Sequence, residues 1–190
     1  MPEYNGSADK RRAAAMDMDF TIPIGRHGGT SLRNLVHLIY SRGDMIGRAT
    51  GGTFGADEGL VEALRDDACT YTRANFLAAL ADYEARHGEA LRGVRITGEA
   101  VSFTGFGRAE DMESLVAYGR LAVLMNEQAL SQKRIRAKRT DCANEKYAMR
   151  SWLNCIGMSG AAFKGTRAVL MRKLSGHAAI RIPKDDGTGE

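Results

Sequence analysis

The sequence predicts an α+β fold in which a small N-terminal sheet with helices is followed by a helical C-terminal half. Residues 20–24 alternate apolar and other side chains, which predicts a strand. Because proline cannot donate to a ladder, this is an edge strand or Pro23 faces away from the pairing side. Residues 94–104 predict a β-hairpin, two short strands joined at Gly98 and Glu99. From Ala109 onward the apolar residues recur at helical spacing. With 190 residues, 44% of them hydrophobic, the chain can bury one ordinary core.

The first predicted helix follows a glycine-rich loop after the edge strand. Its apolar residues begin at Leu32, and Thr30 or Ser31 would cap it by accepting from free N–H groups. Gly43 is expected to end it, and residues 44–53, which contain three glycines, are expected to be irregular.

Two further helices are predicted before the hairpin. Asp57 is expected to cap a short helix, and Thr72 is expected to cap an amphipathic helix that stops at Gly88. The three strands and these helices would form the first domain.

The C-terminal half is predicted to end in a helix-turn-helix-like hairpin. A long helix begins near Met112, and the basic run at residues 132–139 is expected to be helical, with cations on all sides. Whether residues 109–156 form one helix or two stays open. An apolar stripe that includes Trp152 then leads through a glycine turn at residues 157–160 into a second helix.

The expected organisation has four parts. A flexible leader (1–18) precedes a small α+β domain (19–108), a helical domain with the basic segment (109–176) and a loose tail (177–190).

Positive charge is concentrated in residues 130–176. This segment holds 11 Lys and Arg against two acidic residues, a net charge of +9, whereas the rest of the chain has 16 basic and 21 acidic residues, a net of −5. Because clustered positive charge attracts polyanions, we predict that the segment binds nucleic acid or a nucleoprotein, mainly through phosphate contacts. A solvated linker helix is the alternative. The candidate binding residues are Lys133, Arg134, Arg136, Lys138, Arg139, Lys146, Arg150, Lys164, Arg167, Arg172 and Lys173.

The loop at residues 25–31 is a second candidate site. A strand, a glycine-rich loop with a cation and a helix N-terminus together suggest an anion cradle, formed by Arg26, His27, Gly28 and Gly29. The loop matches neither the P-loop nor the GxGxxG pattern, so a tight strand-to-helix connection is the alternative.

No catalytic or metal-binding motif emerges from the remaining polar residues. The four histidines are far apart, and His37, between two apolar neighbours, is expected to be a satisfied structural residue. Three cysteines without a CxxC pair suggest reduced, buried or partly buried thiols in a cytosolic protein. We expect no cofactor, no metal, no enzymatic activity and no membrane segment, since no apolar run approaches the ~20 residues that cross a bilayer.

Several segments together resemble a family of small accessory proteins. They lie at residues 20–25, 31–43 and 49–52 and, near the end of the chain, at 144–147, 157–158, 164–167 and 174–176. The family is carried on conjugative elements and prophages of gut anaerobes and is usually labelled "virulence-related". Some relatives are associated with anti-CRISPR inhibitors of type II, RNA-guided CRISPR nucleases. The resemblance covers nearly the whole chain, implies a protein in the cytoplasm of a host bacterium, and transfers no functional residue.

Three hypotheses follow from the charge pattern and the resemblance. The first is a stoichiometric inhibitor that binds a CRISPR effector nuclease with its guide RNA. The second is a protein of the element that binds DNA or RNA directly. The third is an enzyme that uses the 25–31 loop. For the first two, replacing the five cations of the basic run with Gln is expected to remove binding and leave the fold intact.

Overall fold

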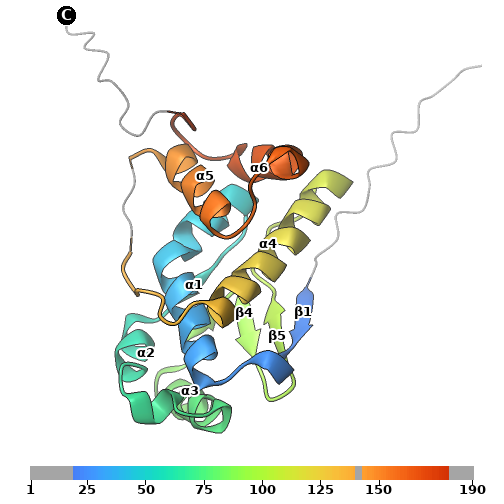
Figure 1. Cartoon of the computed structure of the whole chain (residues 1–190). Helices are drawn as coiled ribbons and strands as arrows, with labels where there is room; N and C mark the ends of the chain where they lie inside the picture. The colour runs from blue at the N-terminus through green and yellow to red at the C-terminus, as the bar shows by residue number, and fades with distance from the viewer. Residues whose placement is uncertain (1–18, 140–142, 180–190) are drawn as a thin grey trace, which may run out of the picture.

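Two long helices, α1 (Gly29–Thr50) and α4 (Met112–Ser131), pack against each other through the middle of the protein. The computed structural model describes residues 19–139 and 143–179. Figure 1 shows a small sheet beside α4, with α2 (Glu58–Ala63) and α3 (Arg73–His87) at one end of the α1–α4 pair and α5 (Glu145–Cys155) and α6 (Lys164–Met171) at the other. The fold is α+β, as predicted.

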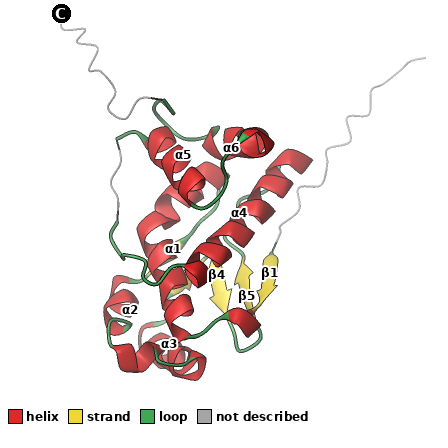
Figure 2. Ribbon diagram, viewed as in Figure 1, coloured by secondary structure: helices red, strands yellow, loops and turns green. Residues whose placement is uncertain are grey.

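The main sheet has three antiparallel strands in the order β1-β5-β4. β4 (Val94–Ile96) and β5 (Ala100–Phe103) form the predicted hairpin, and β1 (Phe20–Pro23) pairs only with β5, which confirms the predicted edge strand. Figure 2 shows these strands as the yellow arrows beside α4. A second sheet, made of β2 (Gly55–Ala56) and β3 (Leu91–Arg92), was not predicted because two residues per strand are too short to show alternation.

The prediction for α1 is wrong at both ends. The helix begins at Gly29 with Gly28 as its N-cap, and Ser31 instead stands in the first turn, where its Oγ accepts from the Gly28 N–H at 3.0 Å. It continues through Gly43 to Thr50 and ends at Gly51, whose φ of +73° is left-handed. Gly43 serves close packing instead of termination, because a Cβ there would lie 2.6 Å from the carbonyl oxygen of Phe54.

The second and third helices agree with the sequence. Asp57 Oδ1 accepts from the Gly59 N–H at the start of α2, and Thr72 Oγ1 accepts from the Asn75 N–H at the start of α3. α3 ends at Gly88, as predicted. A short 3₁₀ turn, Asp67–Thr70, connects the two helices.

The basic run is not helical, so that prediction is wrong. α4 ends at Ser131, and Gln132 leaves it in an extended conformation (ψ 134°). Residues 132–139, called the basic loop below, contain no helix or strand. A helix would have placed Arg134 and Lys138 one turn apart, where like charges repel. Residues 109–156 therefore contain two separate helices.

α5 and α6 form the predicted helical hairpin. The turn begins as a Schellman motif, in which the Met158 N–H donates to Leu153 O at 2.8 Å and the Gly157 N–H to Asn154 O at 3.2 Å. Gly157 has a φ of +97°, which only glycine adopts without strain. A 3₁₀ turn, Ala161–Phe163, precedes α6.

One hydrophobic core takes side chains from both halves of the chain. It includes Leu35 and Phe76 from the first half and Leu121, Met149 and Leu170 from the second. The predicted leader (1–18) and most of the predicted tail (177–190) lie outside the described residues.

Candidate anion-binding interface

The basic loop is fixed to α1 by a buried asparagine. Asn34 is fully buried, its Nδ2 donates to Gln132 O at 2.6 Å and to Ala129 O at 3.3 Å, and its Oδ1 accepts from the Ile135 N–H at 3.0 Å. One side chain thus supplies partners to the end of α4 and to the middle of the loop. Since α1 is rigid and central, the loop is held in one place.

Two more residues of α1, each three positions further on, continue this attachment. His37 Nδ1 lies 2.9 Å from Ile135 O, and the guanidinium of Arg139 lies 4.8 Å above the ring of Tyr40. Ile135 itself is 7% exposed and packs in the core. Residues 34, 37 and 40 share one face of a helix, so the loop runs along that face.

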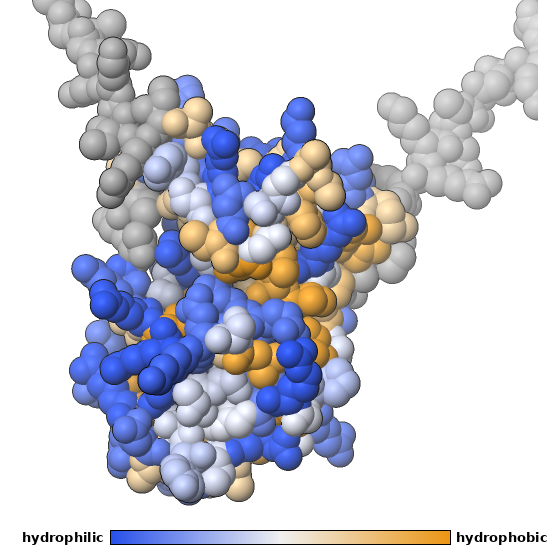
Figure 3. Space-filling model, in the orientation of Figure 1, coloured by the Kyte–Doolittle hydropathy of each residue, from blue (hydrophilic) through white to orange (hydrophobic). Residues whose placement is uncertain are grey.

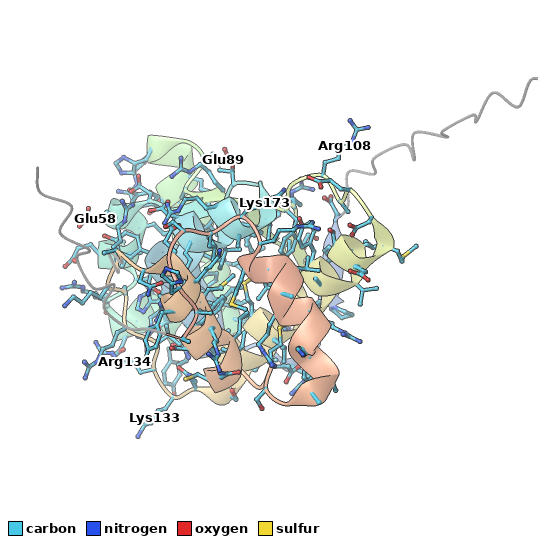
Figure 4. The ribbon with its side chains drawn as sticks, turned by 90° about the horizontal axis from the view of Figure 1, so that it is seen from above. Glu58, Glu89, Arg108, Lys133, Arg134 and Lys173 are labelled. Atoms are coloured by element: carbon cyan, nitrogen blue, oxygen red, sulfur yellow. The ribbon has the colours of Figure 1, made fainter. Side chains whose placement is uncertain are left out.

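The five cations of the basic loop are exposed to solvent, although the guanidinium of Arg139 also lies against Tyr40 of α1. Lys133, Arg134, Arg136, Lys138 and Arg139 are all exposed, while Ile135 is buried and Ala137 half-buried. Among the described residues, none of the five forms an ion pair with an acidic side chain. Figure 4 shows Lys133 and Arg134 extending beyond the ribbon at one edge of the molecule.

A cleft of about 760 Å³ opens beside the loop. It is lined by His37, Arg65, Arg134, Ile135, Arg136, Ala137 and Lys138, and is called the basic cleft below. Among the described residues, the lining includes four cations and no acidic residue. Arg65 pairs with Glu62 at 3.0 Å, but both side chains are 65% exposed, so water weakens this pair. In Figure 3, strongly hydrophilic side chains cover the side where the basic loop and α2 lie.

The surroundings of His37 favour the neutral form of its imidazole. Burial lowers the pKa of its imidazole, the bond to Ile135 O raises it, and the positive charges of Arg33, Arg134 and Arg65 lower it further. Because a carbonyl oxygen only accepts, Nδ1 carries the proton and Nε2 keeps its lone pair. Nε2 is buried and has no hydrogen-bond partner among the described residues. The predicted satisfied histidine is therefore satisfied on one nitrogen only.

The cations of the helical hairpin lie elsewhere and mostly bind the protein itself. Arg167 donates to Met158 O at 2.8 Å and to Gly160 O at 3.1 Å, which closes the turn. Arg172 donates to Ser114 Oγ at 3.1 Å, and Lys173 pairs with Glu110 at 3.4 Å. Arg150 donates to Ala178 O at 3.2 Å. These four predicted binding residues thus have internal partners.

Lys146 and Lys164 complete the predicted set. Neither forms an ion pair with a described acidic residue. Lys146 is half-buried near the start of α5, and Lys164 is exposed at the first position of α6. The two therefore belong to the hairpin and not to the basic loop.

The 25–31 loop also makes internal contacts. The two terminal nitrogens of the Arg26 guanidinium, Nη1 and Nη2, donate to the carboxylate of Glu127 at 2.6 and 3.1 Å. His27 is 4% exposed, and its ring nitrogens lie 3.1 Å from Ser31 Oγ and 2.9 Å from Asn126 Oδ1. Burial lowers the pKa of His27. Gly29 lets α1 approach the backbone of residues 70–72, because a Cβ there would lie 2.7 Å from the Thr70 carbonyl carbon. The predicted anion cradle stays a hypothesis.

Other chemistry was also considered along the described chain. Within residues 19–139 and 143–179, no three His, Cys, Asp or Glu side chains gather closely enough to hold a metal ion. Over the same residues, no helix has both the length and the apolar character of a membrane span. Cys69 and Cys155 are free thiols. Cys69 is half-buried, as predicted, but Cys155 is exposed, so the prediction of a buried thiol is wrong there, and Cys142 lies outside the described residues.

The sequence pointed to the basic run but not to the residues that hold it. Asn34 and His37 are polar side chains inside an apolar helical stretch, and that is the signal that a partner segment must satisfy them. Arg65, which lines the cleft from outside the basic loop, is far from the loop in sequence, and nothing in the sequence indicated its role.

Comparisons of the chain with protein-family models, with curated proteins and with solved structures find no match.

Proposed function

We propose that this protein is a non-enzymatic accessory protein of a mobile genetic element or phage, which inhibits a type II, RNA-guided CRISPR nuclease by stoichiometric binding. It would act in the cytoplasm of the host bacterium. The resemblance to accessory proteins of conjugative elements and prophages supplies the class of target. The basic loop supplies the surface.

The observation that carries the proposal is the fixed presentation of the five cations. Their backbone is held by Asn34 and His37, and no acidic side chain in the described residues pairs with them. A surface that is already ordered loses little conformational freedom on binding, and its unpaired charge accelerates association with a polyanion. Guide RNA, target DNA and an acidic protein face all offer the complementary charge.

Matched charge variants test the proposal. In the first variant Lys133, Arg134, Arg136 and Lys138 become Gln, while Arg139 is kept because it stacks on Tyr40. In the control, four exposed cations elsewhere, Arg86, Arg92, Arg95 and Arg108, become Gln, so both proteins lose the same charge.

Each protein is titrated into a guide-loaded type II nuclease, and cleavage of target DNA and co-elution are measured. The wild type and the control variant are expected to abolish cleavage near one equivalent, and the loop variant is expected to need at least about a hundredfold more protein, since each lost charge-assisted contact is worth about 1.5 kcal/mol or more. Equal inhibition by the loop variant would remove the basic loop from the interface.

Full cleavage with several different nucleases would contradict the inhibitor proposal. Direct binding to DNA or RNA is then measured against salt, where a slope of roughly one unit in log K per phosphate neutralised would indicate a nucleic-acid-binding protein of the element. For the enzyme alternative, Arg26→Ala/His27→Ala should abolish any turnover found.

A further inference from the structure

The buried nitrogen Nε2 of His37 is a candidate ligand-binding atom. The side chain is 5% exposed, and Nε2 has no hydrogen-bond partner among the described residues. Buried polar atoms in native proteins almost always have a partner, supplied by protein, water or a bound group. Since the ring lines the basic cleft, a group bound in the cleft can supply that partner after a small shift of the atoms that cover Nε2.

The positive charges that line the basic cleft favour the binding of an anion. Arg134, Arg136 and Lys138 alternate with the inward-facing Ile135 and Ala137 along the loop, and Arg65 approaches from the end of α2. Cations from two separate segments thus line one cavity, and no acidic residue in the described part of the chain lines it. Arginine side chains match the oxygens of phosphate with paired N–H groups, and lysine adds a point charge.

We propose that the basic cleft is a phosphate-binding site in which His37 is a proton-coupled ligand. The neutral ring cannot donate from Nε2, because its one proton is on Nδ1, bonded to Ile135 O. Protonation of Nε2 turns it into a donor toward a phosphate oxygen. The cleft would hold either a phosphodiester of a nucleic acid or a free phosphate, since both present the same oxygens. Phosphate binding here does not require that the protein inhibit a nuclease.

Binding and proton uptake must then favour each other. In the free protein, burial is the main cause that lowers the pKa of His37, and the charges facing the ring are Arg33 on α1, Arg65 after α2 and Arg134 on the loop. A bound phosphate offsets these positive charges and accepts a hydrogen bond from the imidazolium, so the pKa of His37 rises on binding. With the bound pKa above the free one, affinity increases as pH falls between the two values, by up to tenfold per pH unit for one proton.

The experiment uses the full-length protein with its histidine rings labelled with ¹⁵N. Three probes are added separately: inorganic phosphate, a single-stranded DNA decamer and a single-stranded RNA decamer. Saturable binding is expected to move the Nε2 signal of His37 from the unprotonated to the protonated range. His27, whose two nitrogens already have partners, is the internal control and should not move. Phosphate binding alone would identify a free-phosphate site, and binding of the decamers a phosphodiester site.

Two variants decide the assignment. Arg134→Gln/Arg136→Gln is expected to weaken binding at least tenfold, which corresponds to about 1.4 kcal/mol, whereas the exposed control pair Arg92→Gln/Arg95→Gln should bind like the wild type. His37→Gln is expected to remove the pH dependence of the binding affinity, and circular dichroism checks that this variant folds. If it does not fold, the Nε2 signal of His37 is followed instead in the Arg134→Gln/Arg136→Gln variant. Saturable binding with an unchanged His37 signal, equal binding by the arginine pair, or no binding of any probe would overturn the proposal.

Discussion

Replacing Asn34 with leucine tests whether this buried side chain fixes the basic loop. The two side chains are similar in size, so the change removes the polar groups with little change in volume. It deprives the Ile135 N–H of its acceptor at 3.0 Å and the Gln132 carbonyl of its donor at 2.6 Å. An unsatisfied buried group costs about 1–3 kcal/mol. The two groups together would therefore lower the free energy of unfolding by about 2–6 kcal/mol if the loop stays in place.

The loop can avoid most of that cost by leaving α1. Its polar groups then reach water, but Ile135, now 7% exposed, loses its burial, worth about 2 kcal/mol, and the bond from His37 to Ile135 O is lost, worth about 1 kcal/mol. We therefore expect Asn34→Leu to lower the free energy of unfolding by about 3 kcal/mol, an amount that a domain with 5–15 kcal/mol of stability survives.

Urea denaturation measures the change in the free energy of unfolding, and amide hydrogen exchange measures whether the basic loop leaves α1. Exchange at the Ile135 amide should accelerate to the rate of an open loop, while amides in the middle of α4 stay protected. Ser41→Ala on the same helix is the matched control, because Ser41 Oγ bonds only carbonyls of its own helix, His37 O and Leu38 O. A leucine variant whose Ile135 amide remains protected would refute the role assigned to Asn34.

Two further predictions concern the scaffold. Gly43→Ala is expected to destabilise the protein by about 1–3 kcal/mol in thermal denaturation, because its Cβ would meet the Phe54 carbonyl at 2.6 Å, while Gly25→Ala, with nothing within 4 Å, should be neutral; equal stability of the two would contradict this packing. Burial raises the pKa of Glu145, but hydrogen bonds from Ser175 N–H and Oγ and from Arg48 outweigh it and leave the pKa below its ordinary 4.5. The ionised Glu145 therefore stabilises the protein above about pH 4.5, and this contribution is lost as pH falls below that value. In urea denaturation, Glu145→Gln should be less stable than the wild type at pH 7 and approach the wild-type stability near pH 3. A stability difference that does not depend on pH would contradict this prediction.

Much of the fold was predictable because its signals are local. Alternation gave β1 and the hairpin, and the caps Asp57 and Thr72 act on backbone N–H groups within three residues. The end of α1 was not predictable in this way. Whether Gly43 ends a helix or admits a neighbouring backbone depends on where Phe54 lies, and this contact forms only in the folded chain.

In the candidate site, too, some features were predictable from the sequence and others depend on contacts that form only in the folded chain. The basic run was visible in composition, but its conformation was predicted wrongly because eight residues rich in Lys and Arg favour a helix by propensity alone. The contacts of Ile135 with Asn34 and His37, about a hundred residues away in sequence, override that preference. The hairpin cations were predicted as binding residues because composition cannot show that Arg167 and Arg172 already have partners inside the protein.

The non-helical conformation of the basic loop changes how its charge is presented. A helix would have turned the five cations toward all sides, so that a partner could meet only some of them. In the observed loop Ile135 is buried and the neighbouring Arg134 and Arg136 are exposed, so these two cations lie on the solvent side of the loop. Because His37 holds the same stretch of backbone through Nδ1 and lines the basic cleft, a ligand that binds His37 also acts on the residue that positions these cations. The proposed phosphate binding would therefore be linked to the anchoring of the loop through one imidazole, and the protonation of His37 would report on both.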